Sequence, residues 1–296
     1  MYTFLRRTVV ALALLVGTAP LALAAGPITV LVTNDDGVGA PGIDAMVEAL
    51  DANPNLNVVV YAPLDNQSGT GDSFTTSGTL AVSSTMTASG YPAVAVDGFP
   101  ADAVLYGILA GLATPPDLVV SGINFGQNIA EVSELSGTVG AATWGARNGV
   151  PGIAVSQGIP PAPTTADYER TAAFVALVVE RFRLGGQSRY FERKGSKPAI
   201  VLNINAPTCS SGSIKGVRVV PLGQSVNVTG YTGSGTVTPV VSNQSPFSVD
   251  CTTPLLEPAT DLDGFTAGFV TVTPLGINRT INQSLKGFRF LQKLAY

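Results

Sequence analysis

Between residues 28 and 206 the chain alternates short, almost wholly apolar runs with segments whose apolar residues recur at helical spacing. A run that is apolar throughout has both faces buried, which is typical of strands in a parallel sheet covered by helices on both sides. The alternation therefore predicts an α/β fold with a mostly parallel sheet. Strands are expected at residues 28–33, 57–63, 79–83, 93–96, 117–122, 152–156 and 199–204, and helices at 41–52, 100–112, 136–148 and 166–184.

The sequence pattern changes after residue 206. Residues 207–258 are rich in Ser, Thr, Gly, Val and Pro without a helical period, which indicates β-hairpins or an extended arm. A late strand is expected at 265–274, and the tail at 277–296 is weakly helical. A chain of 296 residues has room for one large domain or two small ones. We therefore expect an α/β core at 25–206, followed at 207–296 by a β-rich arm and a C-terminal segment that completes the core.

Residues 1–24 have the pattern of a signal peptide. Arg6 and Arg7 precede an apolar run at 9–16, and Ala22-Leu23-Ala24 is a small-x-small cleavage site. An uncleaved membrane anchor is the alternative, but the apolar run is short for a membrane span and Pro20 follows it. We expect cleavage after Ala24, export to a periplasm or to the outside of the cell, and no stable membrane association afterwards.

The chain has two cysteines, Cys209 and Cys251. In an oxidising compartment two cysteines are most simply a disulfide pair, and two buried free thiols are the alternative. A bridge that closes a loop of this length would stabilise the fold by about 4 kcal/mol in the chain-entropy model.

The absence of histidine from the sequence excludes several kinds of site. Ser-His-Asp and Cys-His hydrolases and histidine-ligated zinc or iron sites all need a histidine. Two cysteines are also too few for a four-cysteine zinc site. Any bound metal is therefore expected to be a hard ion held by oxygen atoms. The chain has a net charge of −4, whereas proteins that bind duplex nucleic acid need positive charge to contact its phosphates, so we do not expect this chain to bind it.

Polar residues follow three of the predicted strands at the point where each strand ends. In an open α/β sheet, ligands bind beyond the carboxyl ends of the strands, so these residues are expected to converge. Adjacent carboxylates repel each other, and a divalent cation removes the repulsion. Backbone N–H groups at the start of the helix predicted at 136–148 suit a phosphate. The candidate residues are Asp35, Asp36, Ser68, Asn124, Asn128, Ser136, Gly137 and Thr138.

Each of these signals has an ordinary structural explanation. Asp-Asp-Gly after a strand is most often a turn with a capping aspartate, and Ser-Gly-Thr before a helix is usually an N-cap. It is their placement at successive strand ends that favours a hard-cation site next to an oxyanion site.

Four motifs resemble those of the SurE family of metal-dependent nucleotidases. They are TNDDGVGAPG at 33–42, APLDNQSG at 62–69, VSGINFGQN at 120–128 and SGTV at 136–139. GFPAD at 98–102 and VTVTPL at 270–275 also fit the family. The resemblance is good over about 28–205 and weakens beyond.

The resemblance implies a Rossmann-like core and a C-terminal arm used to form a homodimer or homotetramer. It also implies one divalent cation per subunit, Mg²⁺ or Mn²⁺, with Ca²⁺ as an alternative occupant. The family removes phosphate from nucleoside 5′- or 3′-monophosphates, and some members act as acid phosphatases or on polyphosphate. Carried over by position, the metal ligands would be Asp35, Asp36, Ser68 and Asn124, and the phosphate-binding residues Asn128 and 136–138.

We therefore expect an exported phosphomonoesterase in which the metal activates a water molecule and Asp35 or Asp36 takes its proton. The sequence departs from the family at Gly39, where His is common, at Phe99, where Thr is usual, and at Leu135, where an aromatic residue is common. The basic residues common near Asp65 and Gln67 are also missing. These departures motivate an alternative, a phosphate- or nucleotide-binding protein of the same fold with impaired turnover.

Two further alternatives have less support. A covalent aspartyl-phosphatase would need its nucleophile at residue 34, but Asn34 cannot form an acyl phosphate. A glycosylated coat protein would explain the Asn-x-Ser/Thr triplets, such as the one that begins at Asn66, but short triplets arise by chance in a chain rich in these residues.

Overall fold

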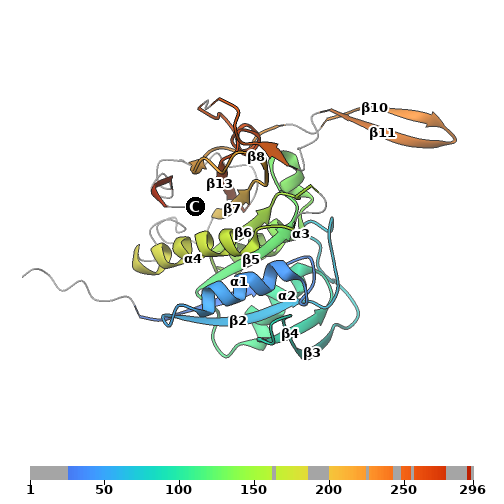
Figure 1. Cartoon of the computed structure of the whole chain (residues 1–296). Coiled ribbons are helices and arrows are strands. Elements are labelled where there is room, and N and C mark those ends of the chain that lie inside the picture. The colour runs from blue at the N-terminus through green and yellow to red at the C-terminus, as the bar shows by residue number, and fades with distance from the viewer. Residues whose placement is uncertain are drawn as a thin grey trace, which may run out of the picture.

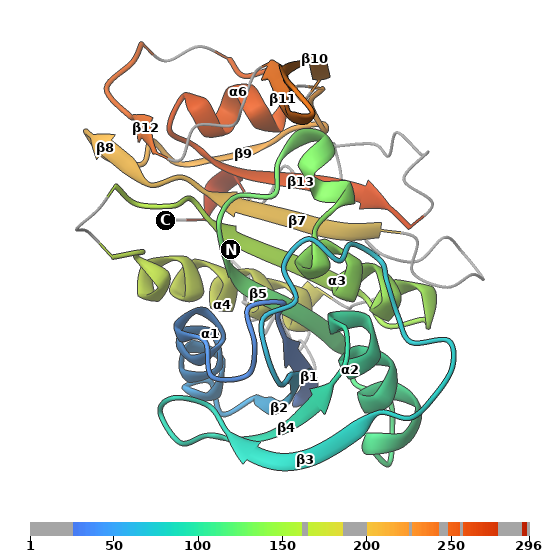
Figure 2. The same cartoon turned by 90° about the vertical axis from the view of Figure 1, so that its right-hand side faces the viewer.

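A computed structural model describes residues 26–161, 165–185, 200–224, 227–242, 248–254, 257–277 and 292–294. The expected signal peptide and most of the tail that was predicted to be weakly helical lie outside these residues. The architecture is a nine-stranded sheet with helices on both faces (Figures 1 and 2). The strands of this sheet are β1 (Ile28–Thr33), β2 (Leu56–Pro63), β3 (Ala81–Met86), β4 (Pro92–Asp97), β5 (Leu118–Phe125), β6 (Gly152–Gln157), β7 (Ile200–Ala206), β9 (Val217–Val219) and β13 (Val270–Gly276).

The strand order is β3-β4-β2-β1-β5-β6-β7-β13-β9. The pairs from β4 to β7 are all parallel, which confirms the parallel sheet predicted from the apolar runs. Two pairs in this sheet are antiparallel: β3 with β4 at one edge, and β13 with β7 toward the other. From β1 the chain builds outward through β2 and then returns to place β5 on the other side of β1. The carboxyl ends of β1 and β5 therefore form the topological switch point, where such sheets bind their ligands.

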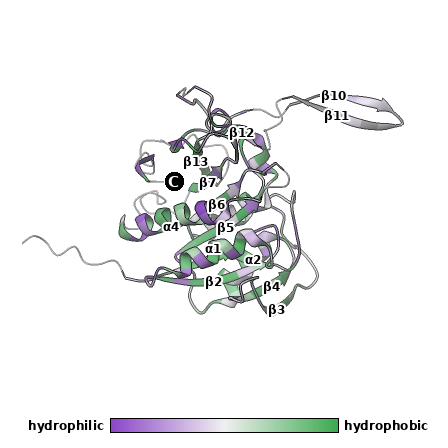
Figure 3. Ribbon diagram, viewed as in Figure 1, coloured by the Kyte–Doolittle hydropathy of each residue, from purple (hydrophilic) through white to green (hydrophobic). Residues whose placement is uncertain are grey.

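Helices cover the two faces in pairs. Helices α1 (Pro41–Asp51) and α4 (Tyr168–Gly185) lie on one face, and α2 (Pro100–Tyr106) and α3 (Gly137–Arg147) lie on the other (Figure 2). A wider helical turn, η1 (Gly107–Gly111), continues α2. The core is contributed by the strands and by the inner sides of these helices, and Figure 3 shows the hydrophobic colour along β2 and β5. In the part of the chain that the structure describes, no helix combines the length and apolarity needed to cross a membrane.

Beyond β7 the chain is mostly β-structure, as its composition predicted. It contains the short strands β8 (Cys209–Ser211) and β12 (Val249–Asp250), which pair with each other. It also contains an antiparallel hairpin of β10 (Asn227–Ser234) and β11 (Thr236–Ser242), which projects from the body of the molecule (Figure 1). Cys209 and Cys251 form a disulfide, as expected.

The prediction of a strand at 265–274 was wrong for its first residues. Phe265 belongs to helix α6 (Asp261–Thr266), and the strand β13 begins at Val270. A capping box explains the helix, because the side chain of Thr260 accepts from the backbone of Asp263, whose side chain accepts from the backbone of Thr260. The apolar residues Phe265 and Phe269 look like one extended run in the sequence, yet Phe265 is buried from α6 and Phe269 from the connection between α6 and β13.

Candidate active site

The two central strands bring the first pair of candidate residues together. Thr33 at the end of β1 pairs with Ser121 of β5, so the chain beyond each strand emerges at the same edge of the sheet. Asp35 and Asp36 lie just beyond the end of β1, after Asn34, and Asn124 lies near the end of β5. The sheet register therefore places carboxylate and amide side chains at the switch point.

Asp35 is the most enclosed of these residues, with 3% of its surface exposed. The hydroxyl of Thr138, in the first turn of α3, donates to Oδ1 of Asp35 over 2.5 Å. Burial raises the pKa of Asp35 to about 6, and the charge of Asp36 adds to the increase, whereas the hydrogen bonds from Thr138 oppose it. The start of α3 therefore faces a buried carboxyl group, where its N–H groups stabilise negative charge.

Asp36 is held at the end of β5. Its Oδ2 accepts a hydrogen bond from the backbone N–H of Phe125 over 2.9 Å, and its Oδ1 lies 3.4 Å from the side-chain nitrogen of Asn66. Burial raises the pKa of Asp36. The same carboxylate acts on Tyr168 at the start of α4, whose pKa is raised to about 12 by burial and then by the charge of Asp36. Tyr168 is a neighbour of the site that no sequence pattern indicated.

A pocket of about 230 Å³ opens beside Asp35. It brings together five of the candidate residues from four separate segments of the chain, whereas Asp36, Gly137 and Thr138 are not among its lining residues. The candidate residues in its wall are Asp35, Ser68, Asn124, Asn128 and Ser136, and its other lining residues include Phe125 and Leu135.

Ser68 and Asn124 present neutral oxygen atoms to this pocket. The side-chain nitrogen of Asn124 donates to the carbonyl of Gly126 over 2.6 Å, which leaves its amide oxygen as the possible ligand. Ser68 lies on an exposed loop that is tied to the site by its neighbour, because the N–H of Gln67 donates to the carbonyl of Asp35 over 2.7 Å. Both residues therefore lie at the pocket, and their role as metal ligands stays a prediction.

At the start of α3 the three expected phosphate-binding residues have structural tasks as well. The Ser136 hydroxyl accepts from the N–H of Val139 over 3.1 Å and caps the helix. Gly137 is required by close approach, because a Cβ at this position would lie 2.9 Å from Cβ of Asp35. The Thr138 side chain is directed at Asp35. Phosphate binding by these residues stays a prediction.

Asn128 is the remaining expected phosphate-binding residue. Its side-chain nitrogen donates to the hydroxyl of Ser156 over 2.9 Å and lies 3.4 Å from the hydroxyl of Thr138. Its backbone is hydrogen-bonded to two asparagines of β7, Asn203 and Asn205. These supporting residues were missed by the sequence reasoning. Their signal was the presence of two asparagines in a strand that is otherwise apolar.

The donor set fits a divalent cation. Among the described residues the ion pairs are Arg147 with Asp72 and Arg183 with Glu180, so neither Asp35 nor Asp36 has a basic partner there. No group of three or more His, Cys, Asp or Glu side chains gathers anywhere in the described ranges. The site is thus two carboxylates completed by amide and hydroxyl oxygens, a set that suits a hard ion retaining places for water and substrate.

A sequence model of the family described as "Survival protein SurE" matches residues 30–228 of the chain. The chain belongs to the SurE family. A SurE protein of Desulfitobacterium hafniense named "5'-nucleotidase SurE" is 35% identical over 270 residues, which are 88% of this chain and 95% of that protein. A protein of the same name from Methanopyrus kandleri is 38% identical over 195 residues, which are 65% of this chain and 71% of that protein.

The fold comparison agrees with the sequence comparison. The crystal structure of the SurE protein from Aquifex aeolicus is similar to this chain with a TM-score of 0.65 and 30% identity. The similarity covers 89% of this chain and 99% of the Aquifex protein, so the Rossmann-like fold class that the motifs implied is confirmed.

Proposed function

We propose that this chain is a metal-dependent phosphomonoesterase that hydrolyses nucleoside monophosphates, with 5′-monophosphates as its first candidates. The observation that carries the proposal is the pair of adjacent carboxylates, Asp35 and Asp36, which lie beside the start of α3 without a basic partner among the described residues. Membership in the SurE family supports a phosphoric monoester hydrolase, and the names of two relatives support the 5′ position.

In the proposed site one divalent cation, Mg²⁺ or Mn²⁺, would be held by Asp35, Asp36, Ser68 and Asn124. A cation at this position supplies Lewis acidity toward phosphoryl oxygens and offsets negative charge in the transition state. The residues of the chain would bind the phosphoryl group and accept the proton. The N–H groups that begin α3 orient the phosphoryl group together with Asn128, and Asp35 or Asp36 takes the proton of the attacking water.

The pocket also has a place for the organic part of the ester. Phe125 and Leu135 line it, and they leave 50% and 66% of their surfaces exposed. Large apolar side chains exposed beside the polar candidate residues favour a ligand with an apolar portion, such as a nucleobase. This rim supports nucleosides as leaving groups over small polar alcohols.

A phosphatase screen with each divalent ion tests the proposed function. We expect release of inorganic phosphate from adenosine 5′-monophosphate with Mn²⁺ or Mg²⁺, and slower release from glycerol phosphate. The Asp36→Asn variant, which is nearly isosteric, should lose more than about 100-fold in kcat/KM. Binding of the nucleotide without turnover by the metal-loaded wild type would overturn the proposal in favour of the impaired binding protein.

We also propose that residues 1–24 are removed on export, with the mature chain beginning at Ala25. The apolar run and cleavage site of this segment support the proposal, and so does the disulfide, since disulfides persist in oxidising compartments. Expression in a bacterium with a periplasm, followed by N-terminal sequencing of the periplasmic fraction, tests it. An intact Met1 in the cytoplasmic fraction would contradict it.

A last proposal is that the β10–β11 hairpin holds a homodimer or homotetramer together. The hairpin projects from the body and exposes 65% of Tyr231, which favours contact with another subunit (Figure 1). Light scattering of the full chain should give a multiple of the monomer mass. A variant in which 230–238 is replaced by a short Gly-Ser turn should give the monomer mass, and an unchanged mass would refute the role of the hairpin.

A further inference from the structure

The 126–130 loop carries Asn128 and forms one wall of the active-site pocket. It connects β5 to a short 3₁₀ helix, η2 (Ala130–Glu134). Ala130 has a φ of 49°, a left-handed conformation that costs energy for a residue with a Cβ. Such a conformation persists only where the surroundings hold it, so the contacts of this loop decide the position of Asn128.

The first contact is with β7. The N–H of Asn128 donates to Oδ1 of Asn205 over 2.7 Å, and the carbonyl of Asn128 accepts from the side-chain nitrogens of Asn203 and Asn205 over 2.7 and 3.3 Å. Both asparagines are fully buried. Their amide groups thus pair with the Asn128 backbone as a neighbouring strand would.

The second contact is with the segment around the disulfide. Ile129 is fully buried in a cluster with Val249, Cys251 and Phe265, and Cys209 packs against the edge of this cluster. The next residue is also tied there, because the N–H of Ala130 donates to Oδ2 of Asp261 over 3.0 Å. Two consecutive residues after Asn128 are therefore anchored on residues 249–265.

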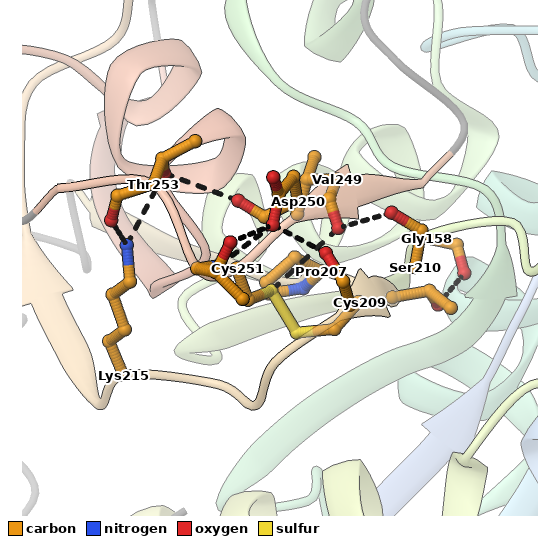
Figure 4. Close-up of a disulfide and its surroundings, with 12 residues drawn as sticks. Gly158, Pro207, Cys209, Ser210, Lys215, Val249, Asp250, Cys251 and Thr253 are labelled. Carbon is orange, nitrogen blue, oxygen red and sulfur yellow. Dashed lines mark hydrogen bonds between the residues drawn. A yellow bond between two sulfur atoms is a disulfide. The ribbon is translucent and has the colours of Figure 1, made fainter.

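Residues 249–251 of that segment are held to the chain around β8 by the disulfide and by a few hydrogen bonds, among them those from the N–H groups of Val249 and Cys251 to the carbonyls of Thr208 and Ser211 over 2.9 and 3.0 Å. Strands β8 and β12 are three and two residues long, and their pairing shifts register between Val249 and Asp250. Figure 4 shows the sulfur–sulfur bond between Cys209, which begins β8, and Cys251, which directly follows β12. Beside it, the hydroxyl of Ser210 donates to the carbonyl of Val249 over 3.1 Å. The bond spans 42 residues of sequence, which include the projecting hairpin.

We propose that the Cys209–Cys251 disulfide positions the active-site loop, so that full turnover requires the oxidised protein. The proposal rests on the proposed function for its activity readout. A dithiol reductant supplies two electrons and two protons, the sulfur–sulfur bond breaks into two thiols, and the reductant becomes a cyclic disulfide. Residues 249–251 are then held to the β8 region by hydrogen bonds alone, the packing around Ile129 loosens, and Asn128 supports Thr138 less firmly.

The test compares the oxidised full chain, the chain reduced with dithiothreitol, and a Cys209→Ala/Cys251→Ala variant. Hydrogen exchange followed by mass spectrometry should show faster exchange in peptides covering 126–134 in both altered forms, with α1 unchanged. With adenosine 5′-monophosphate and Mn²⁺, kcat/KM should fall at least about tenfold. Reoxidation of the reduced chain should restore both measurements.

Two matched substitutions separate positioning from general loss of stability. Ile129→Ala should reproduce the faster exchange and the lower kcat/KM in the oxidised protein, and Ile129→Val should largely retain the wild-type values. Leu50→Ala truncates an equally buried side chain near the C-terminal end of α1, so it should change neither the hydrogen exchange of the loop nor kcat/KM. Equal exchange and equal kcat/KM in oxidised and reduced chains would overturn the proposal, as would loosening that is uniform over the whole fold.

The exchange measurement also distinguishes the two ways of failing. If the oxidised wild type releases no phosphate from any ester, the proposed function fails. Reduction that leaves exchange at 126–134 unchanged refutes the anchoring role of the disulfide whatever the activity of the protein.

Discussion

The hydroxyl of Thr138 donates a hydrogen bond to Oδ1 of the buried Asp35 over 2.5 Å. Thr138 lies in the first turn of α3 on one face of the sheet, and Asp35 lies just beyond the end of β1 in the middle of the sheet. This bond joins the SGTV motif to the first aspartate of the TNDDG motif. It explains why two short motifs about 100 residues apart in the sequence belong to one site.

Replacing Thr138 by Val should weaken the site without changing its shape. Hydrogen bonds to charged groups contribute about 1.5–3 kcal/mol, so Thr138→Val should lower Mn²⁺ affinity by about tenfold or more. Thr138→Ser, which keeps the hydroxyl, should retain most of it. Isothermal titration with Mn²⁺ measures the effect. Thr143→Val is the control, because Thr143 is buried in the same helix but donates to the carbonyl of Val139.

The metal-free protein should lose stability as the pH rises from about 4 to about 6. Burial raises the pKa of Asp35 from 3.8 to about 6, so in this range the folded state binds more protons than the unfolded state. The loss should total about 3 kcal/mol and level off above pH 6. Urea unfolding in a chelator across this range measures it. The Asp35→Asn variant, which has no titrating group at this position, should lack this part of the trend.

A methyl group at Gly137 should disturb Asp35 although alanine is the better helix former. The added Cβ would lie 2.9 Å from Cβ of Asp35 and 3.1 Å from its Oδ2, so one of the two residues must move. Because small displacements of catalytic groups are costly, kcat/KM should fall by about 10- to 100-fold in Gly137→Ala. Gly39→Ala is the matched control, since a Cβ there meets no atom within 4 Å. Equal activity in both variants would contradict the packing argument.

Divalent ions should raise the thermal stability of the wild type in a concentration-dependent way. A ligand present at 100 times its Kd stabilises the folded state by about 2.7 kcal/mol. A thermal shift assay with Mn²⁺ should therefore show a clear increase in Tm for the wild type and little or none for Asp36→Asn. A shift of the same size in the variant would place the bound ion elsewhere.

Sequence patterns were sufficient for the centre of the sheet and for most of the pocket wall. Uniformly apolar runs such as Val30 to Val32 must be buried on both faces, which fixes a parallel sheet and the edge where polar residues converge. Asp35, Ser68 and Asn124 meet there for that reason. Composition also indicated the β-rich part of the chain and the pairing of Cys209 with Cys251.

Contacts between distant segments were not predictable in the same way. The pairing of β7 with β13, and the positions of Asn203, Asn205 and Asp261 behind the loop, depend on chain segments that local periodicity cannot relate to each other. The helix α6 was missed because the capping pair of Thr260 and Asp263 was outweighed by the apolar residues that follow it.

The anchoring of the 126–130 loop limits how far this protein could be shortened by engineering. Every predicted ligand precedes residue 139, so a fragment ending after β7 would retain the four motifs that carry the predicted ligands. It would also lose Asp261 and the partners of Ile129, the contacts that fix the backbone beside Asn128. A minimal nucleotidase therefore cannot be designed from the motifs alone, and the chain beyond β7 must be retained with them.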